Sequence, residues 1–298
     1  ALEPELQGHS LWYAARLRFM RKRAAVFSVL LLGLITLACV VGPWLLPHAF
    51  DSADWDAMSQ SPTLKNMHWF GTDESGRDLL VRSLIGGRIS LMVGLASVML
   101  SAAVGVSLGL LAGFVGGRLD AFIMRLCDVM LSFPAILVAL LIAGVGRALF
   151  PNANESLAFG VLIISISLTG WVQYARTVRG TTLVERNKEY VQAARVTGVA
   201  PLRIMFKHVL PNVMGPVMVL ATIQVATAII TEATLSFLGV GAPPTSPSLG
   251  TLIRVGNDYL FSGEWWITIF PGAMLVIIAL SVNLLGDWLR DALNPRLR

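Results

Sequence analysis

The stretch ISLMVGLASVMLSAAVGVSLGLLAGFV, residues 89–115, decides the fold class, because it contains no ionisable side chain over its whole length. A helix needs about 20 mostly apolar residues to cross the hydrocarbon core of a bilayer, and this stretch is long enough. The whole chain of 298 residues agrees, with 55% hydrophobic residues, 14% charged residues and a mean hydropathy of +0.69. Water-soluble proteins rarely have this composition. The sequence therefore predicts an all-α integral membrane protein of a single transmembrane domain, residues 1–298.

Further apolar runs predict a polytopic protein with six transmembrane helices. In chain order, the expected spans are residues 24–46, 89–115, 130–150, 157–174, 213–240 and 265–285. Asp120, Arg125 and Asp128 precede the third span, so we expect its entry to be partly solvated. The tail of residues 1–23 ends in LWYAARLRFMRKR (residues 11–23), whose mixture of apolar and basic residues is typical of an elbow helix in the membrane interface. No convincing cleavage site follows, so we expect the first span to be retained.

The basic residues of the connections predict the orientation, since Lys and Arg accumulate in short cytoplasmic loops. Most of them lie on one side of the membrane, in the tail of residues 1–23, in the connection of residues 176–211 and in the tail of residues 286–298. The acidic connection of residues 47–88 lies on the other side. We therefore expect both termini in the cytoplasm. The net charge of +5 then fits a membrane surface, and we expect lipid rather than nucleic acid as its partner.

The cytoplasmic connection contains EYVQAARVTGVAPLRIMFKHVLPN, residues 189–212, which interrupts the apolar runs with an alanine-rich, basic segment. Residues 191–197 predict a helix, and Gly198 stands where a helix ends in a left-handed cap. Pro201 begins a second short helix, and Pro211 is expected to stop it before the fifth span. The sequence thus predicts a compact helix, turn and helix on the membrane surface.

Two features of this segment concern what it could contact. The small side chains of Ala193 and Ala194 let another surface come close, and Arg195, Arg203 and Lys207 could orient a partner or anionic lipid. The alternative is a short loop that packs only on its own bundle. The residue types leave both interpretations open.

The spacing of the segment resembles the EAA loop of membrane subunits of bacterial ABC importers. The residues that carry the resemblance and their neighbours in the segment are Glu189, Gln192, Ala193, Ala194, Arg195, Gly198, Pro201, Leu210 and Pro211. In that family the loop's short helix docks in a groove of a cytoplasmic ATPase, so the resemblance implies that these residues couple the chain to an ATPase. Gln192 replaces the usual glutamate and His208 the usual isoleucine, so the resemblance implies the docking helix without an ion pair at residue 192.

Three further segments narrow the resemblance to the C-type permease subunit of bacterial oligopeptide and dipeptide importers. They are HWFGTDESGRDLLVRSLIGGRISLMVG (residues 68–94), EATLSFLGVGAPP (residues 232–244) and NLLGDWLRDALNPRLR (residues 283–298). The resemblance implies the type I ABC importer permease fold in a bacterial inner membrane, with residues 47–88 in the periplasm. It also implies a B-type permease as heterodimer partner, two ATPase subunits and an extracytoplasmic peptide-binding protein. Oligopeptides are the favoured substrates and dipeptides the next, with glutathione and peptide-like antibiotics left open.

The sequence contains no recognisable catalytic machinery. Without a Gly-Lys dipeptide it lacks the phosphate-binding loop of an ATPase, and the acidic residues 73–78 do not have the spacing of a calcium loop. The histidines are scattered along the chain: His9, His48, His68 and His208. We therefore expect no catalytic residue, no metal and no cofactor in this chain, with ATP and magnesium bound by partner ATPases.

Polar residues in the fifth expected span mark a candidate substrate path. Gln224, Thr227, Thr231 and Thr234 recur at intervals of three, four and three, which places them on one face of a helix. Such a stripe in a membrane tends to face a bundle interior or water. The alternative is that the threonines bond to carbonyls of their own helix and face a neighbouring helix. Glu232 lies off the stripe, and we interpret it as a paired structural carboxylate.

The main hypothesis is a non-enzymatic subunit that converts ATP-driven movement of its partners into alternating access, with residues 192–211 as the mechanical contact. An ion-coupled secondary transporter would need charged pairs deep in the spans, which the second and sixth spans lack. A membrane sensor or scaffold would need no ATPase partner.

Overall fold

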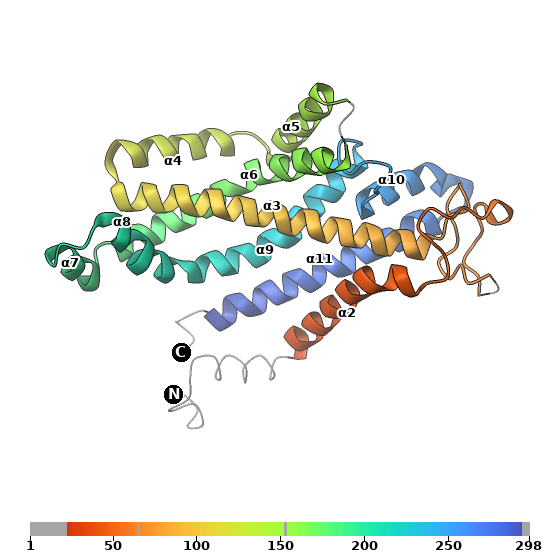
Figure 1. Ribbon diagram of the computed structural model, residues 1–298, viewed down its shortest axis with the longest axis horizontal. Coiled ribbons are helices and arrows are strands. Elements are labelled where there is room, and N and C mark those ends of the chain that lie inside the picture. Colours follow the sequence, from red (N-terminus) through yellow and green to blue (C-terminus); the bar gives the residue numbers. More distant parts are fainter. Residues whose placement is uncertain (1–22, 65, 152–153, 294–298) are drawn as a thin grey trace.

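The computed structural model describes residues 23–64, 66–151 and 154–293, and their regular secondary structure is helical apart from two isolated β-bridges. The long and short α-helices are α2 (Arg23–Leu45), α3 (Leu79–Val115), α4 (Gly117–Leu131), α5 (Ala135–Leu149), α6 (Glu155–Glu185), α7 (Glu189–Val196), α8 (Pro201–Arg203), α9 (Leu210–Phe237), α10 (Leu249–Tyr259) and α11 (Trp266–Leu293). The expected all-α fold is confirmed (Figure 1). The expected elbow helix lies outside the described residues, except for its last residue, which begins α2.

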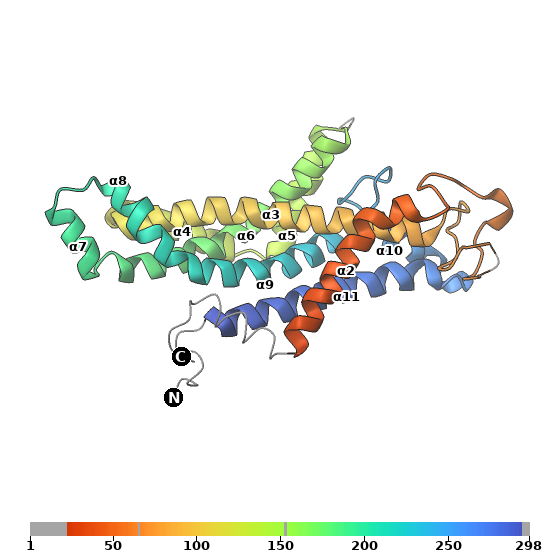
Figure 2. The same cartoon turned by 60° about the horizontal axis from the view of Figure 1, so that its bottom comes forward.

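Within the described residues, five helices are long and apolar enough to cross a membrane: α2, α3, α6, α11 and the helix that runs from Pro201 through α9. The pair α4 and α5 passes the same test only jointly and is bent by 89° at its break (Figure 2). The expected third span, residues 130–150, is therefore not one helix. Pro134 is the N-cap residue of α5, and a proline both lacks the N–H of a continuing helix and disfavours helical backbone at the residue before it. With the bent pair counted as one span, the total is six.

The α3 helix starts earlier than the sequence suggested, so residues 79–88 are its first turns rather than part of the preceding connection. Its N-cap is Asp78, whose Oδ1 accepts the backbone N–H of Val81 at 2.9 Å. Thr72 and Asp73 are also suitable N-cap residues, and the sequence favours a helix start near them, but no helix begins at either residue. Asp73 instead closes the turn that precedes α3, where its Oδ1 accepts two backbone N–H groups at 2.9 Å.

Other boundaries also differ from the expected ones, because long helices continue past the apolar part of their sequence. Residues 176–185 belong to α6, although the sequence predicts a connection there. Residues 286–293 belong to α11, although the sequence predicts a tail there. The helix α10 was not expected at all. It begins after Ser248, whose hydroxyl accepts the backbone N–H of Thr251 at 3.3 Å.

The helices α3 and α6 form the most extensive helix pair of the described chain. Three glycines of α3 lie four residues apart against the backbone of α6: Gly105, Gly109 and Gly113. A Cβ at Gly105 would lie 2.3 Å from the carbonyl oxygen of Trp171, and one at Gly109 would lie 2.4 Å from that of Ala175. Small residues at this spacing let two membrane helices approach closely, so the glycines fix the register of the pair.

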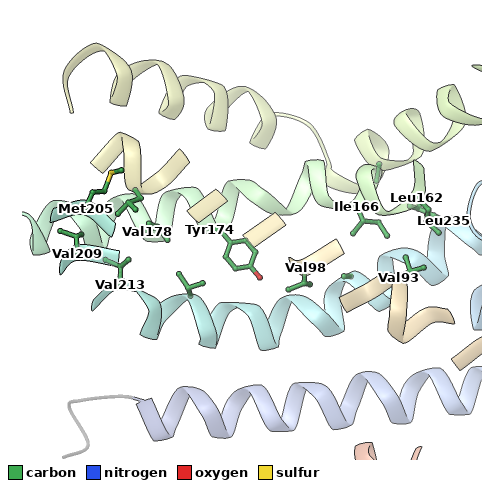
Figure 3. Close-up of a cluster of buried hydrophobic side chains, with 14 of the residues drawn as sticks. Val93, Val98, Leu162, Ile166, Tyr174, Val178, Met205, Val209, Val213 and Leu235 are labelled. Atoms are coloured by element: carbon green, nitrogen blue, oxygen red, sulfur yellow. The ribbon is translucent and has the colours of Figure 1, made fainter. Parts of the chain in front are cut away.

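The main hydrophobic core lies between α3, α6 and α9. Figure 3 shows its buried side chains facing one another: Val93, Val98, Leu162, Ile166, Tyr174, Val178, Met205, Val209, Val213 and Leu235. Val191 of the short helix α7 belongs to the same cluster. One continuous core therefore connects α7 to the membrane-spanning helices.

The connection between α2 and α3 packs on the start of α11. The indole Nε1 of Trp266 donates to the carbonyl oxygen of Thr72 at 3.1 Å, and the rings of Phe70 and Phe270 stack with centroids 4.2 Å apart. These contacts hold the connection against the end of the bundle that is opposite to α7 (Figure 1).

The helix α5 leaves the bundle at a steep angle (Figure 2) but is tethered near its far end. Arg147 donates through Nη1 to the carbonyl oxygen of Gly239 at 2.7 Å and through Nη2 to that of Gly241. Both glycines lie in the α9–α10 connection, residues 238–248. Pro134 at one end, Arg147 at the other and the buried Ala139 and Ala143 between them therefore set the position of α5.

The glycine contact between α3 and α6 predicts a difference between two equivalent substitutions. Gly109→Ala would press a methyl group onto the backbone of α6, and such overpacking costs about 1–3 kcal/mol. The thermal midpoint of the purified protein in detergent should fall. Gly180→Ala is the matched control, because a Cβ there touches nothing within 4 Å and alanine is the better helix former. Equal midpoints for the two variants would contradict the proposed role of the glycines.

Candidate functional site

The helix α7 ends in the left-handed cap that the sequence predicts. Gly198 has a φ of +76°. The backbone N–H of Val199 donates to the carbonyl oxygen of Ala194 at 3.1 Å, and the backbone N–H of Gly198 donates to the carbonyl oxygen of Arg195 at 3.0 Å. These two bonds form a Schellman motif. A Cβ at Gly198 would meet nothing within 4 Å, so the backbone conformation alone favours glycine there.

One side of α7 packs on the main core, and the other side is exposed. Val191 is fully buried in the main core, and Ala194 and Val199 pack against that core. Ala193 is exposed, and Val196 is 89% exposed. In Figure 1, α7 lies beyond the ends of the long helices, so its exposed side forms an accessible end surface of the described chain.

The segment after the cap is one continuous helix rather than a short helix followed by a stop. It begins at Pro201, passes through the π-helical segment Ile204–Val209 and continues as α9. The prediction that Pro211 ends the helix is wrong. The backbone N–H of Leu210 reaches back to the carbonyl of Met205, and this wider turn places Pro211 in the first turn of α9, where a missing N–H is tolerated. Leu210 packs against the main core, whereas Pro211 and Pro201 are exposed.

The polar residues of α7 are partly engaged with their own chain. Gln192 donates through Nε2 to the carbonyl oxygen of Arg186 at 3.2 Å, and the guanidinium of Arg195 lies 5.6 Å from the ring centroid of Phe114. Glu189 is exposed in the first turn, where a carboxylate interacts favourably with the helix dipole. The candidate segment is therefore fixed in position by its own chain while much of its surface remains open.

A cavity of about 90 Å³ lies among α3, α5, α6 and α9. Its polar lining consists of Ser97, Ser101, Thr169, Gln173, Tyr174, Gln224, Thr227 and Thr231. None of the residues that line it carries a charge. Its walls can therefore offer hydrogen bonds to a polar molecule without binding an ion strongly.

Three members of the predicted polar stripe line this cavity, namely Gln224, Thr227 and Thr231, whereas Thr234 does not. Gln224 donates through Nε2 to the side-chain oxygen of Gln173 at 2.9 Å and so connects α9 to α6. Thr227 and Thr234 donate to carbonyl oxygens one turn back in α9, at 3.2 and 2.8 Å. The two interpretations of the stripe are therefore compatible, since a threonine can bond to its own helix and still face the cavity.

Glu232 is completely buried and is bonded to hydroxyl groups. Its two carboxylate oxygens accept hydrogen bonds from the hydroxyl groups of Ser90 at 2.7 Å and Ser236 at 2.6 Å. The same hydroxyl oxygens accept the backbone N–H groups of Leu249 at 3.3 Å and Ala242 at 3.0 Å. One carboxylate thus holds both ends of the α9–α10 connection, a role that the sequence could not reveal because Ser90 is distant along the chain.

Two of the scattered histidines come together in the structure. The rings of His48 and His68 stack with centroids 4.2 Å apart and planes at 21°, and His68 Nδ1 lies 2.8 Å from Asp78 Oδ2. These three residues are close enough together to be considered as metal ligands. The lone pairs of two nearly parallel rings do not converge on one ion, so the geometry favours a hydrogen-bonded contact that holds the connection against the start of α3.

The fold defines the class of protein. Its arrangement is similar to a chain of the inward-facing MetNI methionine ABC transporter, with a TM-score of 0.54 and 20% identity over 69% of this chain and 93% of that chain. At this identity the likeness concerns the fold alone. The protein has the fold of an ABC importer permease.

Sequence comparisons are more specific. Residues 105–298 match the family described as binding-protein-dependent transport system inner membrane component, and residues 10–62 match the N-terminal TM domain of oligopeptide transport permease C. The oligopeptide transport system permease protein OppC of Haemophilus influenzae is 42% identical over 99% of this chain and 91% of its own length. OppC of Escherichia coli is 42% identical (98% and 93%), and that of Bacillus subtilis 38% (97% and 91%). The chain therefore belongs to the family of binding-protein-dependent inner-membrane transport components, as a C-type permease.

The Glu232 contacts predict that the carboxylate restrains the α9–α10 connection. Glu232→Ala would leave two buried hydroxyl groups without their acceptor, and a buried polar group left without its partner costs about 1–3 kcal/mol. In a protein that carries Thr245→Cys as a reporter in this exposed connection, maleimide labelling should become several-fold faster. The native Cys39 and Cys127 are buried and should react slowly.

Thr234→Val is the control for this experiment, since its hydroxyl bonds only within α9. An unchanged labelling rate in Glu232→Ala would show that the carboxylate does not hold the connection.

Proposed function

We propose that the chain is the permease subunit of an ATP-driven importer that carries peptides across the bacterial inner membrane, with oligopeptides favoured and dipeptides next. The observation that carries this proposal is α7, which is anchored in the core on one side and exposed on the other, in a protein whose relatives are named oligopeptide permeases. A short helix with a free face at the end of a bundle is suited to docking in a groove of a partner.

The partner proposed for this face is a cytoplasmic ATPase, which would place α7 and both termini in the cytoplasm. The candidate residues of the segment would form this surface or, for Ala194 and Leu210, which pack against the core, support it from behind: Glu189, Gln192, Ala193, Ala194, Arg195, Gly198, Pro201, Leu210 and Pro211. The continuous helix from Pro201 into α9 supports this role, because no non-helical break separates its first turn from the part that can span the membrane. ATP and magnesium would be bound by two ATPase subunits and not by this chain.

The cavity is the proposed contribution of this subunit to the translocation path. A path for peptides of varied sequence should not hold any side chain tightly, and neutral groups such as Gln224, Thr227 and Thr231 meet that requirement. A B-type permease would supply the other half, and an extracytoplasmic peptide-binding protein would deliver the substrate at the periplasmic end.

Gly198 offers a direct test of the docking role. Gly198→Val should lose the ATPases, because a left-handed backbone costs about 1–2 kcal/mol for a residue with a Cβ and more for a branched one. Gly198→Asn is the matched control, since asparagine tolerates this conformation. Gentle solubilisation followed by mass spectrometry should find ATPases and a second permease with the unsubstituted chain and with Gly198→Asn, but only the second permease with Gly198→Val.

Two results would contradict the proposal in different ways. If the unsubstituted chain is recovered alone or with copies of itself, the importer assignment fails. If Gly198→Val retains both ATPases and full uptake, the assignment of α7 as the docking element fails.

The path is tested by placing a charge in it. Thr227→Lys should lower peptide uptake about tenfold or more, because an ammonium group in the path is unfavourable at membrane depth and repels cationic substrates. Assembly of the complex is verified by the same co-purification. Unchanged uptake in an assembled complex would exclude Thr227 from the path.

A further inference from the structure

The hydroxyl group of Tyr190 joins three helices at one atom. It donates to Oε2 of Glu185, at the end of α6, at 2.7 Å. It accepts from Nδ2 of Asn212, in the first turn of α9, at 3.2 Å. Tyr190 itself lies in the first turn of α7, so the two bonds connect α7 to both α6 and α9.

The two hydrogen-bond partners of this hydroxyl each make a further bond to another group. The other oxygen of Glu185 accepts Lys188 Nζ at 2.6 Å, and Asn212 also donates to the carbonyl oxygen of His208 at 2.7 Å. Asn212 is thus held by the turn that precedes it in the same continuous helix, and Glu185 is held by Lys188 in the connection between α6 and α7. Burial, together with the Glu185 acceptor, raises the pKa of Tyr190 to about 12, so the phenol keeps its proton at ordinary pH.

The two helices that the hydroxyl connects to α7 are walls of the cavity. Gln173 of α6 and Gln224 of α9 both line it and bond to each other at 2.9 Å. Val191 and Ala194 attach α7 to the core by apolar contacts, and its further polar contacts, from Gln192 to the carbonyl oxygen of Arg186 and from Arg195 to the ring of Phe114, do not involve α9. Apolar contacts resist separation but are not directional, whereas the two hydrogen bonds fix the orientation of α7 relative to both helices.

We propose that Tyr190 is a positioning residue for energy coupling, which orients α7 so that its displacement by the ATPase moves α6 and α9 together. This inference rests on the proposed function and adds the element that transmits the movement. Tyr190 need not touch the ATPase for this role. Its removal should therefore spare docking but weaken the response of the cavity.

The test reads the cavity directly and needs no known substrate. Thr227→Cys is introduced as a reporter in the complete complex with ATPases and the second permease, and maleimide labelling is measured without nucleotide, with ATP, and with ATP plus vanadate. The native cysteines are buried and contribute little background. Nucleotide should change the labelling rate when Tyr190 is present, and Tyr190→Phe should reduce that change by about tenfold, which is the scale of one hydrogen bond to a charged group.

Thr197→Val provides a matched control. It also removes one hydroxyl from the α7 region, but that hydroxyl bonds only to the carbonyl oxygens of Ala193 and Ala194 within the same helix. The nucleotide response should be retained in this variant. Both variants should still co-purify with the ATPases.

Asn212→Ala separates transmission from a general loss of stability. If Tyr190 acts on α9 through Asn212, the double variant Tyr190→Phe with Asn212→Ala should lose no more of the nucleotide-dependent change in labelling than Tyr190→Phe alone. Additive losses would show that the two residues act independently and would overturn this route.

The remaining outcomes assign failure to one proposal or the other. No nucleotide response in the parent complex would contradict the proposed function. A normal parent response that persists in Tyr190→Phe would overturn the positioning role, and loss of ATPases from Tyr190→Phe would show that Tyr190 serves docking instead.

Discussion

The close approach of α3 and α6 is the constraint on which the rest of the structure depends. With glycine at Gly105, Gly109 and Gly113, the two backbones touch, and the larger side chains are displaced to the flanks of the pair. Two buried hydrogen bonds reinforce the contact, from Ser101 to the carbonyl of Ser167 at 3.2 Å and from Ser167 to that of Ser97 at 3.0 Å. The flank on which α9 lies then holds both the main core and the polar cavity.

Several charged side chains of the described helices are paired with other side chains, which a hydrocarbon environment favours. Asp120 and Asp128, which the sequence placed at a solvated entry, form ion pairs with Arg179 and Arg176 of α6, both at 2.6 Å. Glu232 uses hydroxyl groups for the same purpose. The cavity can therefore remain uncharged although several charged residues lie in the helices around it.

The sequence predicted the features that depend on neighbouring residues. The apolar runs, the left-handed Gly198 and the face shared by Gln224, Thr227 and Thr231 follow from local composition and helical spacing, and the structure agrees. It did not predict the helix lengths, because a helix continues as long as tertiary contacts support it, even where its residues are polar. The error at Pro211 has a comparable origin, since the π-helical turn that accommodates the proline depends on the packing of the whole segment.

Contacts between residues that are distant along the chain could not be predicted from the sequence. Glu185 and Tyr190 are near neighbours, but nothing in their types indicates that Asn212 completes the group. The pairing of Glu232 with Ser90 and the pairing of Gln173 with Gln224 likewise depend on the register of helices that the sequence does not specify.

The attachment of α5 gives this helix the mechanics of a strut. The chain bends by 89° between α4 and α5, next to Pro134. Near the other end of α5, Arg147 donates hydrogen bonds to the carbonyl oxygens of Gly239 and Gly241. With a rise of about 1.5 Å per residue, a helix of this length is a lever of roughly 20 Å. A rotation of α5 about Pro134 would move its outer end most and Ala135 and Ile136 least, so a displacement of the α9–α10 connection would reach the outer end of α5 while the cavity wall beside Pro134 stays nearly fixed.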